Sequence, residues 1–161
     1  PPGRLPPGVL GTLRVPADTA PAAVAARPGK LPDGSAQSQY NFAFGLLQKN
    51  DYVAAEQAFG EFLSLHASDP LASNAQYWLG ESYFARKEYD RAAQAFLAGY
   101  QKYPKGSKAP DSLLKLAMSL SNLEQKQEAC AAFKQLDKDF PSAPPSLQRL
   151  STSERARAGC R

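Results

Sequence analysis

The stretch "NAQYWLGESYFARKEYDRAAQAF", residues 74–96, decides the fold. It gathers Tyr77, Trp78, Leu79 and Gly80 within about one helical turn, breaks at residues 87 and 88, and resumes with alanines and Phe96. Apolar residues recur on both sides of the break at the spacing of an α-helix. The stretch therefore predicts two helices joined by a short turn.

The same pattern of side-chain sizes returns at a constant step of 37 residues in both directions along the chain. Self-similarity at a fixed step of this length is typical of repeat proteins built from helical hairpins. The step relates Ala55, Ala92 and Ala129, then Phe59, Phe96 and Phe133, and then Ala43, Gly80 and Ala117. We expect the helices of each pair to cross at the small residues, with Leu79, Tyr83 and Phe96 filling the space between pairs.

The fold class predicted from this pattern is all-α, because residues 35–140 lack the alternating Val, Ile and Thr runs of strands. We expect three hairpins at about 36–69, 70–106 and 107–143, and a capping helix at about 145–158, in one domain spanning 35–161. Asp69 and Pro70 are predicted to start the second hairpin as N-cap and first helical residue. A hairpin cannot bury its apolar face alone, so the hairpins should stack into a solenoid.

The middle copy resembles a tetratricopeptide repeat. Leu79-Gly80, Tyr83, Tyr89 and Ala92 fall at the spacings of that family's pattern, as do Phe96 and Pro104, although Trp78 lies two places later than the family's usual tryptophan. The step of 37 residues exceeds the family's usual 34, and the outer copies are degenerate, as terminal repeats often are.

Residues 1–34 differ in composition from the rest. Eight of the 14 prolines lie within 1–33, and proline at that density excludes a regular helix or a central strand. We expect an extended Pro/Gly-rich linker or arm. Two interpretations are possible. The segment is a tether with no fixed contact, or it is an arm whose stretch "GVLGTLRVP" docks on a groove of this or a neighbouring chain.

Charge and hydropathy exclude two classes of partner. The net charge is +4, yet residues 34–144 hold 11 Lys/Arg against 12 Asp/Glu, so the basic excess lies at the two ends. That distribution argues against nucleic acid as a partner. No run of about 18 apolar residues is present, so we expect no membrane insertion.

The residue types needed for catalysis are scarce. His66, the single histidine, takes the place of Tyr103 and Phe140 in the other copies, which predicts a packing role. A lone histidine without a nucleophile or carboxylate partner has no triad to join. The sequence shows no phosphate loop or metal-ligand spacing, and predicts neither an enzyme nor a cofactor or metal.

A protein-binding groove is the functional site that the repeat pattern predicts. At about 100° per residue, the first helix of each hairpin turns one face to its neighbours and a second face toward the concave side of the stack. Ordinary packing is the alternative role for these residues. The predicted groove residues are Tyr40, Phe44, Leu47, Asn74, Tyr77, Trp78, Glu81, Phe84, Asp111, Leu114, Met118 and Asn122. The aromatic content favours a peptide ligand. The predicted groove lacks basic residues that would clamp a C-terminal carboxylate, so we expect such a ligand to be disfavoured.

A narrower resemblance rests on four phrases: "YNFAFGLLQKNDYVAAEQAFGEFL", "NAQYWLGESYF", "YPKGSKAPDSLLKLAMSL" and "EACAAFKQL". Together they resemble the C-terminal domain of the YbgF or CpoB family over roughly 38–160. The resemblance implies a periplasmic protein of the Tol-Pal system, with a signal peptide and a trimerising coiled coil in its full-length form. It also implies TolA and a peptidoglycan synthase as partners, in coordinating peptidoglycan synthesis with outer-membrane constriction during cell division. We expect the fragment itself to be monomeric.

Two cysteines, Cys130 and Cys160, leave two states open. If the last two helices run antiparallel, a disulfide is sterically reasonable, and the periplasm is oxidising. In the other state Cys130 is buried and free and Cys160 unpaired. The function predicted overall is a non-enzymatic periplasmic adaptor, and the alternative is a scaffold for another envelope assembly, such as outer-membrane protein insertion or secretion.

Overall fold

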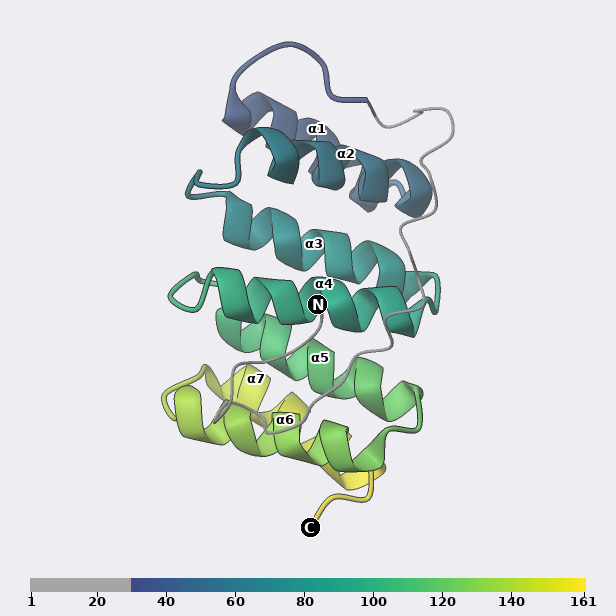
Figure 1. Ribbon diagram of the computed structural model, residues 1–161, viewed down its shortest axis with the longest axis vertical. Coiled ribbons are helices and arrows are strands. Elements are labelled where there is room, and N and C mark those ends of the chain that lie inside the picture. The colour runs from purple at the N-terminus through teal and green to yellow at the C-terminus, as the bar shows by residue number, and fades with distance from the viewer. Residues whose placement is uncertain (1–29) are drawn as a thin grey trace.

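The computed structural model describes residues 30–161, and these residues form seven helices and no strand. Figure 1 shows them stacked one upon another along the long axis of the molecule. The all-α prediction is confirmed. The helices are α1 (Ala36–Gln48), α2 (Tyr52–Leu65), α3 (Ala72–Ala85), α4 (Tyr89–Lys102), α5 (Ala109–Asn122), α6 (Lys126–Asp139) and α7 (Pro145–Arg157).

Three hairpins repeat the same backbone turn. Asn50, Lys87 and Glu124 adopt left-handed φ angles of 59°, 60° and 60°, a conformation that side chains other than glycine seldom take. In each turn the next residue's N–H bonds back to a helix carbonyl, as Glu88 does to Tyr83 at 3.0 Å. The three positions lie 37 residues apart, so the sequence step is also a step of backbone geometry.

The helices form two layers. Among the described helices, α1 contacts α3, α3 contacts α5 and α5 contacts α7. In contrast, α2, α4 and α6 each contact only the helices next to them in the chain. Helices that approach one another lie on the shorter, inner side of a curved stack. We call α1, α3, α5 and α7 the inner layer and α2, α4 and α6 the outer layer.

Small residues sit where the helices of a pair cross, as the repeat predicts. Ala43, Ala117, Ala55, Ala92 and Ala129 are fully buried. A Cβ built on Gly80 in α3 would lie 2.5 Å from the Phe96 ring of α4, closer than carbon atoms can approach. Glycine at this position therefore lets α3 and α4 pack closely.

The prediction for the space between pairs is partly wrong. Phe96 is fully buried, but it packs within its own hairpin against Gly80. Leu79 packs against the core cluster of the first hairpin, as predicted, but Leu79 and Tyr83 are only half-buried and both line an open hollow beside α2. The physical reason is that α2 and α4 do not meet over α3, so the outer side of α3 stays partly uncovered.

The start of the second hairpin also differs from the prediction. Helix α3 begins at Ala72, with Leu71 as its N-cap. Asp69 instead accepts a hydrogen bond from the Leu71 N–H at 2.8 Å, which stabilises a turn before the helix. Pro70 lies in that turn, so the cap-like sequence orders the loop rather than the first helical turn.

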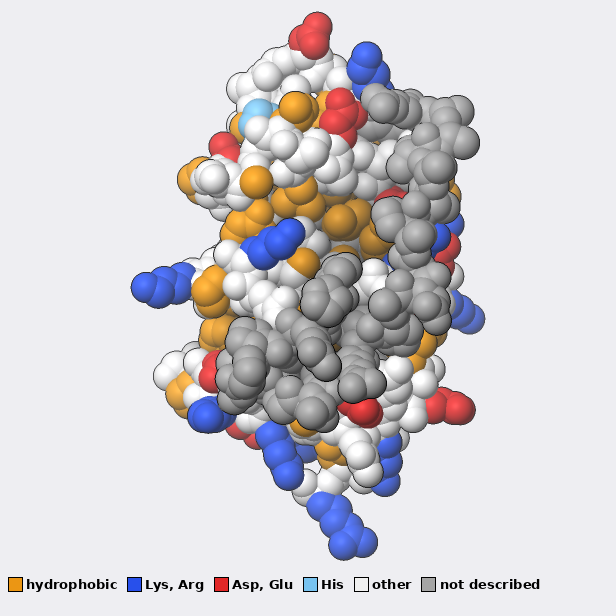
Figure 2. Space-filling model, in the orientation of Figure 1, with side chains coloured by type: hydrophobic (Ala, Val, Ile, Leu, Met, Phe, Trp, Pro, Cys, Tyr) orange, Lys and Arg blue, Asp and Glu red, His pale blue; other side chains and the backbone are white. Residues whose placement is uncertain are grey.

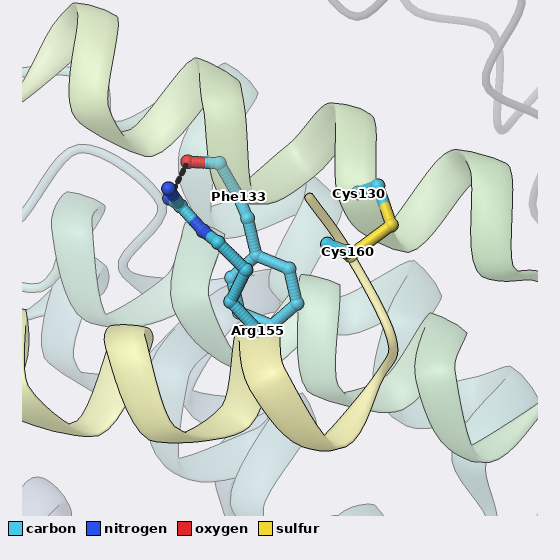
Figure 3. Close-up of a disulfide and its surroundings, with 4 residues drawn as sticks. All are labelled: Cys130, Phe133, Arg155 and Cys160. Carbon is cyan, nitrogen blue, oxygen red and sulfur yellow. Dashed lines mark hydrogen bonds between the residues drawn. A yellow bond between two sulfur atoms is a disulfide. The ribbon is translucent and has the colours of Figure 1, made fainter.

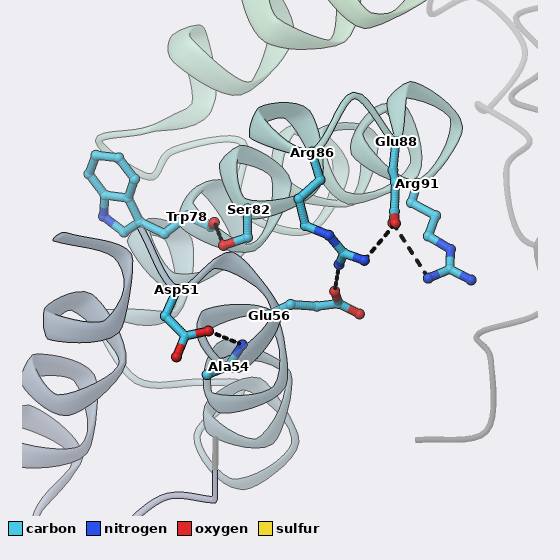
Figure 4. Close-up of polar contacts among 8 residues, drawn as sticks. All are labelled: Asp51, Ala54, Glu56, Trp78, Ser82, Arg86, Glu88 and Arg91. Atoms are coloured by element: carbon cyan, nitrogen blue, oxygen red, sulfur yellow. Dashed lines mark hydrogen bonds and ion pairs between the residues drawn. The ribbon is translucent and has the colours of Figure 1, made fainter. Parts of the chain in front are cut away.

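Charged side chains tie the first hairpin to the second. Arg86, directly after α3, contacts Glu56 of α2 at 2.5 Å and Glu88 at 2.8 Å, and Glu88 lies 3.6 Å from Arg91 of α4 (Figure 4). All four side chains are between 19% and 29% exposed. Water screens such a pair only in part, so this chain of charges helps to fix the angle between the hairpins.

The end of the predicted arm packs on the first hairpin. Leu31 is 5% exposed within the cluster formed by α1 and α2, and its N–H donates to Glu61 at 3.2 Å. Gln39 of α1 donates to the Pro32 carbonyl at 2.9 Å. The remainder of the arm, including "GVLGTLRVP", lies outside the described residues.

Candidate protein-binding groove

Three aromatic side chains of α1 and α3 form the first part of the inner face. Trp78 donates its Nε1–H to the Tyr40 hydroxyl at 2.9 Å, and the Phe44 and Trp78 rings meet edge to face at 5.2 Å between centroids. All three side chains are half-buried. They hold one another in place and keep part of each ring accessible, which is the property of a protein-binding hot spot.

Tyr77 forms the floor beneath this cluster. It is 8% exposed, and its ring contacts Trp78 at 4.9 Å and Phe96 of α4 at 5.7 Å. Burial, and after it the nearby carboxylates of Glu81 and Asp111, hold the Tyr77 pKa well above its usual range. Leu114 is buried as well, at 2% exposed. Both residues differ from the expectation of side chains presented to a partner, because each faces the core beneath the inner layer.

The next part of the inner face is an ion pair set against an aromatic ring. Glu81 of α3 and Lys115 of α5 lie 3.0 Å apart. The Lys115 ammonium also lies 4.4 Å from the centre of the Phe84 ring, where a cation is attracted by the ring's electrons. These contacts join α3 to α5 and place Phe84 beside a charged group.

A second lysine lies over the aromatic floor. Lys108, at the start of α5, places its ammonium 5.1 Å from the Tyr77 ring centre and 5.4 Å from that of Trp78. No ion pair joins it to a carboxylate among residues 30–161. The inner face therefore has basic residues, contrary to the sequence expectation.

A signal for one of these lysines exists in the sequence. The step that carries Tyr40 to Tyr77 also carries Trp78 to Lys115, so Lys115 occupies the groove position of the third hairpin. Lys108 precedes the first helix of that hairpin, where the 37-residue step predicts a loop, and only the structure places it over the rings.

The other predicted residues contribute unequally. Asn74 accepts a hydrogen bond from Ser107 at 3.0 Å, and Met118 is half-buried against the larger core cluster. Leu47 packs on the core cluster of the first hairpin. Asn122 is exposed and bonds to the Met118 carbonyl of its own helix at 2.8 Å. Asn122 thus lies at the edge of the inner face.

Helix α7 closes one end of the groove. A 190 Å³ pocket lies between the three inner-layer helices α3, α5 and α7, lined by Tyr77, Asp111, Leu114 and Lys115 and by three residues of α7. Leu150 of α7 is 41% exposed at this end. The pocket thus lies at the α7 end of the inner face, and its lining does not include Tyr40, Phe44 or Trp78.

A disulfide fastens α7 to the third hairpin. Cys130 of α6 and Cys160 beyond α7 are bonded, with their Cα atoms 5.5 Å apart. Figure 3 shows this bond near the Arg155 side chain, which donates to the Phe133 carbonyl at 2.9 Å. Arg155 also pairs with Asp137 at 2.7 Å. Since α7 buries only Leu147 and Ser151, these bonds supply much of what holds it.

Side chains that could act in catalysis or bind a metal are few in the part of the chain that the structure describes. His66 Nε2 lies 2.7 Å from Gln39 Oε1, and its ring packs on Phe62, which agrees with a packing role. Within residues 30–161 no three His, Cys, Asp or Glu side chains gather as metal ligands. In the same range, none of the helices combines the length and apolar character needed to traverse a bilayer.

Comparison with known families agrees with the stack of hairpins. One tetratricopeptide repeat model matches residues 40–107, and a second matches 111–143. The chain belongs to the tetratricopeptide repeat family. The resemblance stated from the spacing of Leu79-Gly80, Tyr83 and Ala92 is thereby confirmed.

Two curated proteins, both named Cell division coordinator CpoB and both from Pseudomonas putida, are similar to a shorter part of the chain. Each is 45% identical over 47 residues, which is 29% of this chain. The match spans 18% of the relatives' length. Together with the repeat models, it supports a repeat domain like that of CpoB, the family whose resemblance the sequence carries.

Proposed function

We propose that this tetratricopeptide repeat protein is a non-enzymatic adaptor of the cell envelope that binds a partner protein on its inner layer. The observation that carries the proposal is the half-exposed set of Tyr40, Phe44 and Trp78, braced by the Trp78–Tyr40 hydrogen bond. Pre-ordered aromatic side chains bind with little loss of conformational entropy. A face of this kind suits an amphipathic helix or an extended peptide.

The proposed process is cell division, by similarity to proteins named Cell division coordinator CpoB. In this account the chain acts in the periplasm with the Tol-Pal system and coordinates peptidoglycan synthesis with outer-membrane constriction. TolA and a peptidoglycan synthase are the proposed partners. The disulfide Cys130–Cys160 supports an oxidising compartment, and residues 35–161 are the proposed binding domain.

The partner's chemistry follows from the groove. Its aromatic part at α1 and α3 would take apolar side chains, and Lys108, which has a positive charge over two rings, would take a carboxylate. We therefore propose that the bound segment carries an acidic residue next to an apolar anchor.

A titration of the isotope-labelled chain with the periplasmic part of TolA, followed by NMR, tests this proposal. The expected result is that amide shifts gather on α1, α3 and α5 and include the Trp78 indole N–H. Shifts confined to the outer layer would overturn the groove assignment, and no binding by TolA or a peptidoglycan synthase would overturn the proposed process.

A further inference from the structure

A second hollow lies on the other side of the molecule from the inner face. It has a volume of about 470 Å³ and lies between α2 and α3. Figure 2 shows hydrophobic side chains gathered on the viewed face, at the level of α3 between α2 and α4. The residues that line the hollow are Lys30, Glu56, Gln57, Gly60, Glu61, Ser64, Leu65, Leu79 and Tyr83.

The hollow is open because Gly60 carries no side chain and Leu65 is largely exposed. A Cβ built on Gly60, in the middle of α2, would meet nothing within 4 Å, so no contact of the described fold requires glycine there. Glycine inside a helix costs roughly 1 kcal/mol relative to alanine. Leu65 at the rim is 58% exposed. An open glycine beside exposed apolar groups leaves room for another backbone to approach closely.

The chain itself enters the described structure at this hollow. Lys30 lines it, and the next residue, Leu31, is anchored by its buried side chain and by the bond from its N–H to Glu61. The residues that precede Lys30 in the sequence thus start at the rim. We propose that residues 24–29, "VAARPG", dock in the hollow between α2 and α3 of their own chain.

Length and side-chain size fit this occupant. From Glu56 to Leu65 the hollow follows α2 for about 14 Å, at 1.5 Å per residue, and six extended residues span up to about 20 Å. The segment is Val, Ala, Ala, Arg, Pro and Gly, so all of its side chains except that of Arg27 are small.

Charge also fits. The hollow is lined by the carboxylates of Glu56, which also pairs with Arg86, and Glu61, and by the ammonium of Lys30. Arg27 is the single charged residue of the segment. An arginine suits carboxylates at a partly buried site, since its guanidinium donates two parallel hydrogen bonds. The covalent tether at Lys30 gives the segment an effective concentration near millimolar, which favours it over a second copy in dilute solution.

Limited proteolysis with elastase tests the docking in the full chain, because elastase cuts after alanine and Ala25 and Ala26 lie within the proposed segment. The rate of cleavage at these two sites, identified by mass spectrometry, is the quantity compared. The variant Gly60→Leu fills the hollow and improves helix propensity, so the fold persists while the segment is displaced. We expect cleavage about tenfold faster than in the wild-type chain, since the rate follows the population of the open form. Gly45→Leu is the matched control, because a Cβ on Gly45 also meets nothing within 4 Å and Gly45 lies away from the hollow on α1; its rate should equal that of the wild type.

A second variant changes the segment rather than the repeats. Arg27→Glu should accelerate cleavage severalfold, whereas Arg14→Glu, the same charge change outside the segment, should not. Equal rates in the wild-type chain, Gly60→Leu and Arg27→Glu would overturn the proposal. Protection that is lost on dilution would also overturn it, in favour of docking between two copies. Neither result bears on the inner groove, which lies on other residues.

Discussion

Gly80 of α3 lies against the ring of Phe96 in α4, with no room for a methyl group between them: an added Cβ would lie 2.5 Å from the ring. Phe96 is fully buried, so its ring has no free direction in which to move. This contact fixes the distance between the two helices of the middle hairpin. Because Ala43 and Ala117 occupy the equivalent positions, the middle hairpin is the one with the smallest residue at its crossing.

The first prediction is that Gly80→Ala destabilises the protein, although alanine is the better helix former. Overpacking a filled core costs about 1–3 kcal/mol. A Cβ 2.5 Å from a fully buried ring belongs at the upper end of that range, above the roughly 1 kcal/mol gained in helix propensity. Urea unfolding followed by circular dichroism measures the difference. Gly45→Ala is the control, because open space surrounds Gly45. It should gain up to about 1 kcal/mol, and a gain of that size at Gly80 would contradict the crossing contact.

The second prediction concerns the disulfide. Its cysteines are 30 residues apart, and a cross-link closing a loop of that size contributes about 3–4 kcal/mol on the chain-entropy estimate. We expect Cys130→Ser to lower the free energy of unfolding by about that amount. Hydrogen exchange should accelerate first in α7, which buries only two residues. Uniform acceleration over all seven helices would show that the bond does not act through α7.

The third prediction concerns alkaline pH. Tyr100 is 7% exposed and its hydroxyl donates to Asp139. Burial first, and then this bond and the charge of Asp139, raise the Tyr100 pKa well above its usual value near 10. Above pH 10 the unfolded chain therefore loses a proton that the native chain keeps, so the contribution of Tyr100 to stability is present below pH 10 and falls as pH rises further.

Tyr100→Phe is the variant for this test, because it removes the titrating hydroxyl and keeps the ring. Between pH 8 and 11, the free energy of unfolding should fall less steeply in the variant than in the wild-type chain. Unfolding in urea at several pH values measures both slopes. Parallel slopes would contradict a raised pKa at Tyr100, whereas a constant offset between the curves would report only the lost hydrogen bond.

Much of the fold follows from one spacing. The 37-residue step predicts the turns at Asn50, Lys87 and Glu124 and the buried alanines, because each residue of a repeat meets the same neighbours in the next. The step does not predict the start of α3 at Ala72. There, Asp69 bonds to the nearby Leu71 N–H, which is an equally local alternative to capping a helix.

The groove is less predictable than the fold. Helical periodicity gives the face on which Tyr77 lies, but not its depth, which depends on the contact of its ring with Phe96 from another helix. It also does not give Lys108, which reaches the rings from the residue before α5. The hollow beside Gly60 depends on the gap between α2 and α4, and no pattern within one repeat predicts such a gap.

The most direct test of a partner-binding inner layer is the affinity of the chain for the periplasmic part of TolA, measured by calorimetry. Trp78→Ala removes the centre of the aromatic cluster and should weaken binding by about tenfold to a hundredfold, the loss of roughly 1.4–2.8 kcal/mol typical of a hot-spot residue. Phe42→Ala is the control: Phe42 is 37% exposed and is the equivalent of Leu79, outside the groove set. The affinity of Phe42→Ala for TolA should stay within about twofold of the wild-type value, as is typical of a substitution outside a hot spot. Unchanged affinity in Trp78→Ala, with helical content intact, would contradict the account.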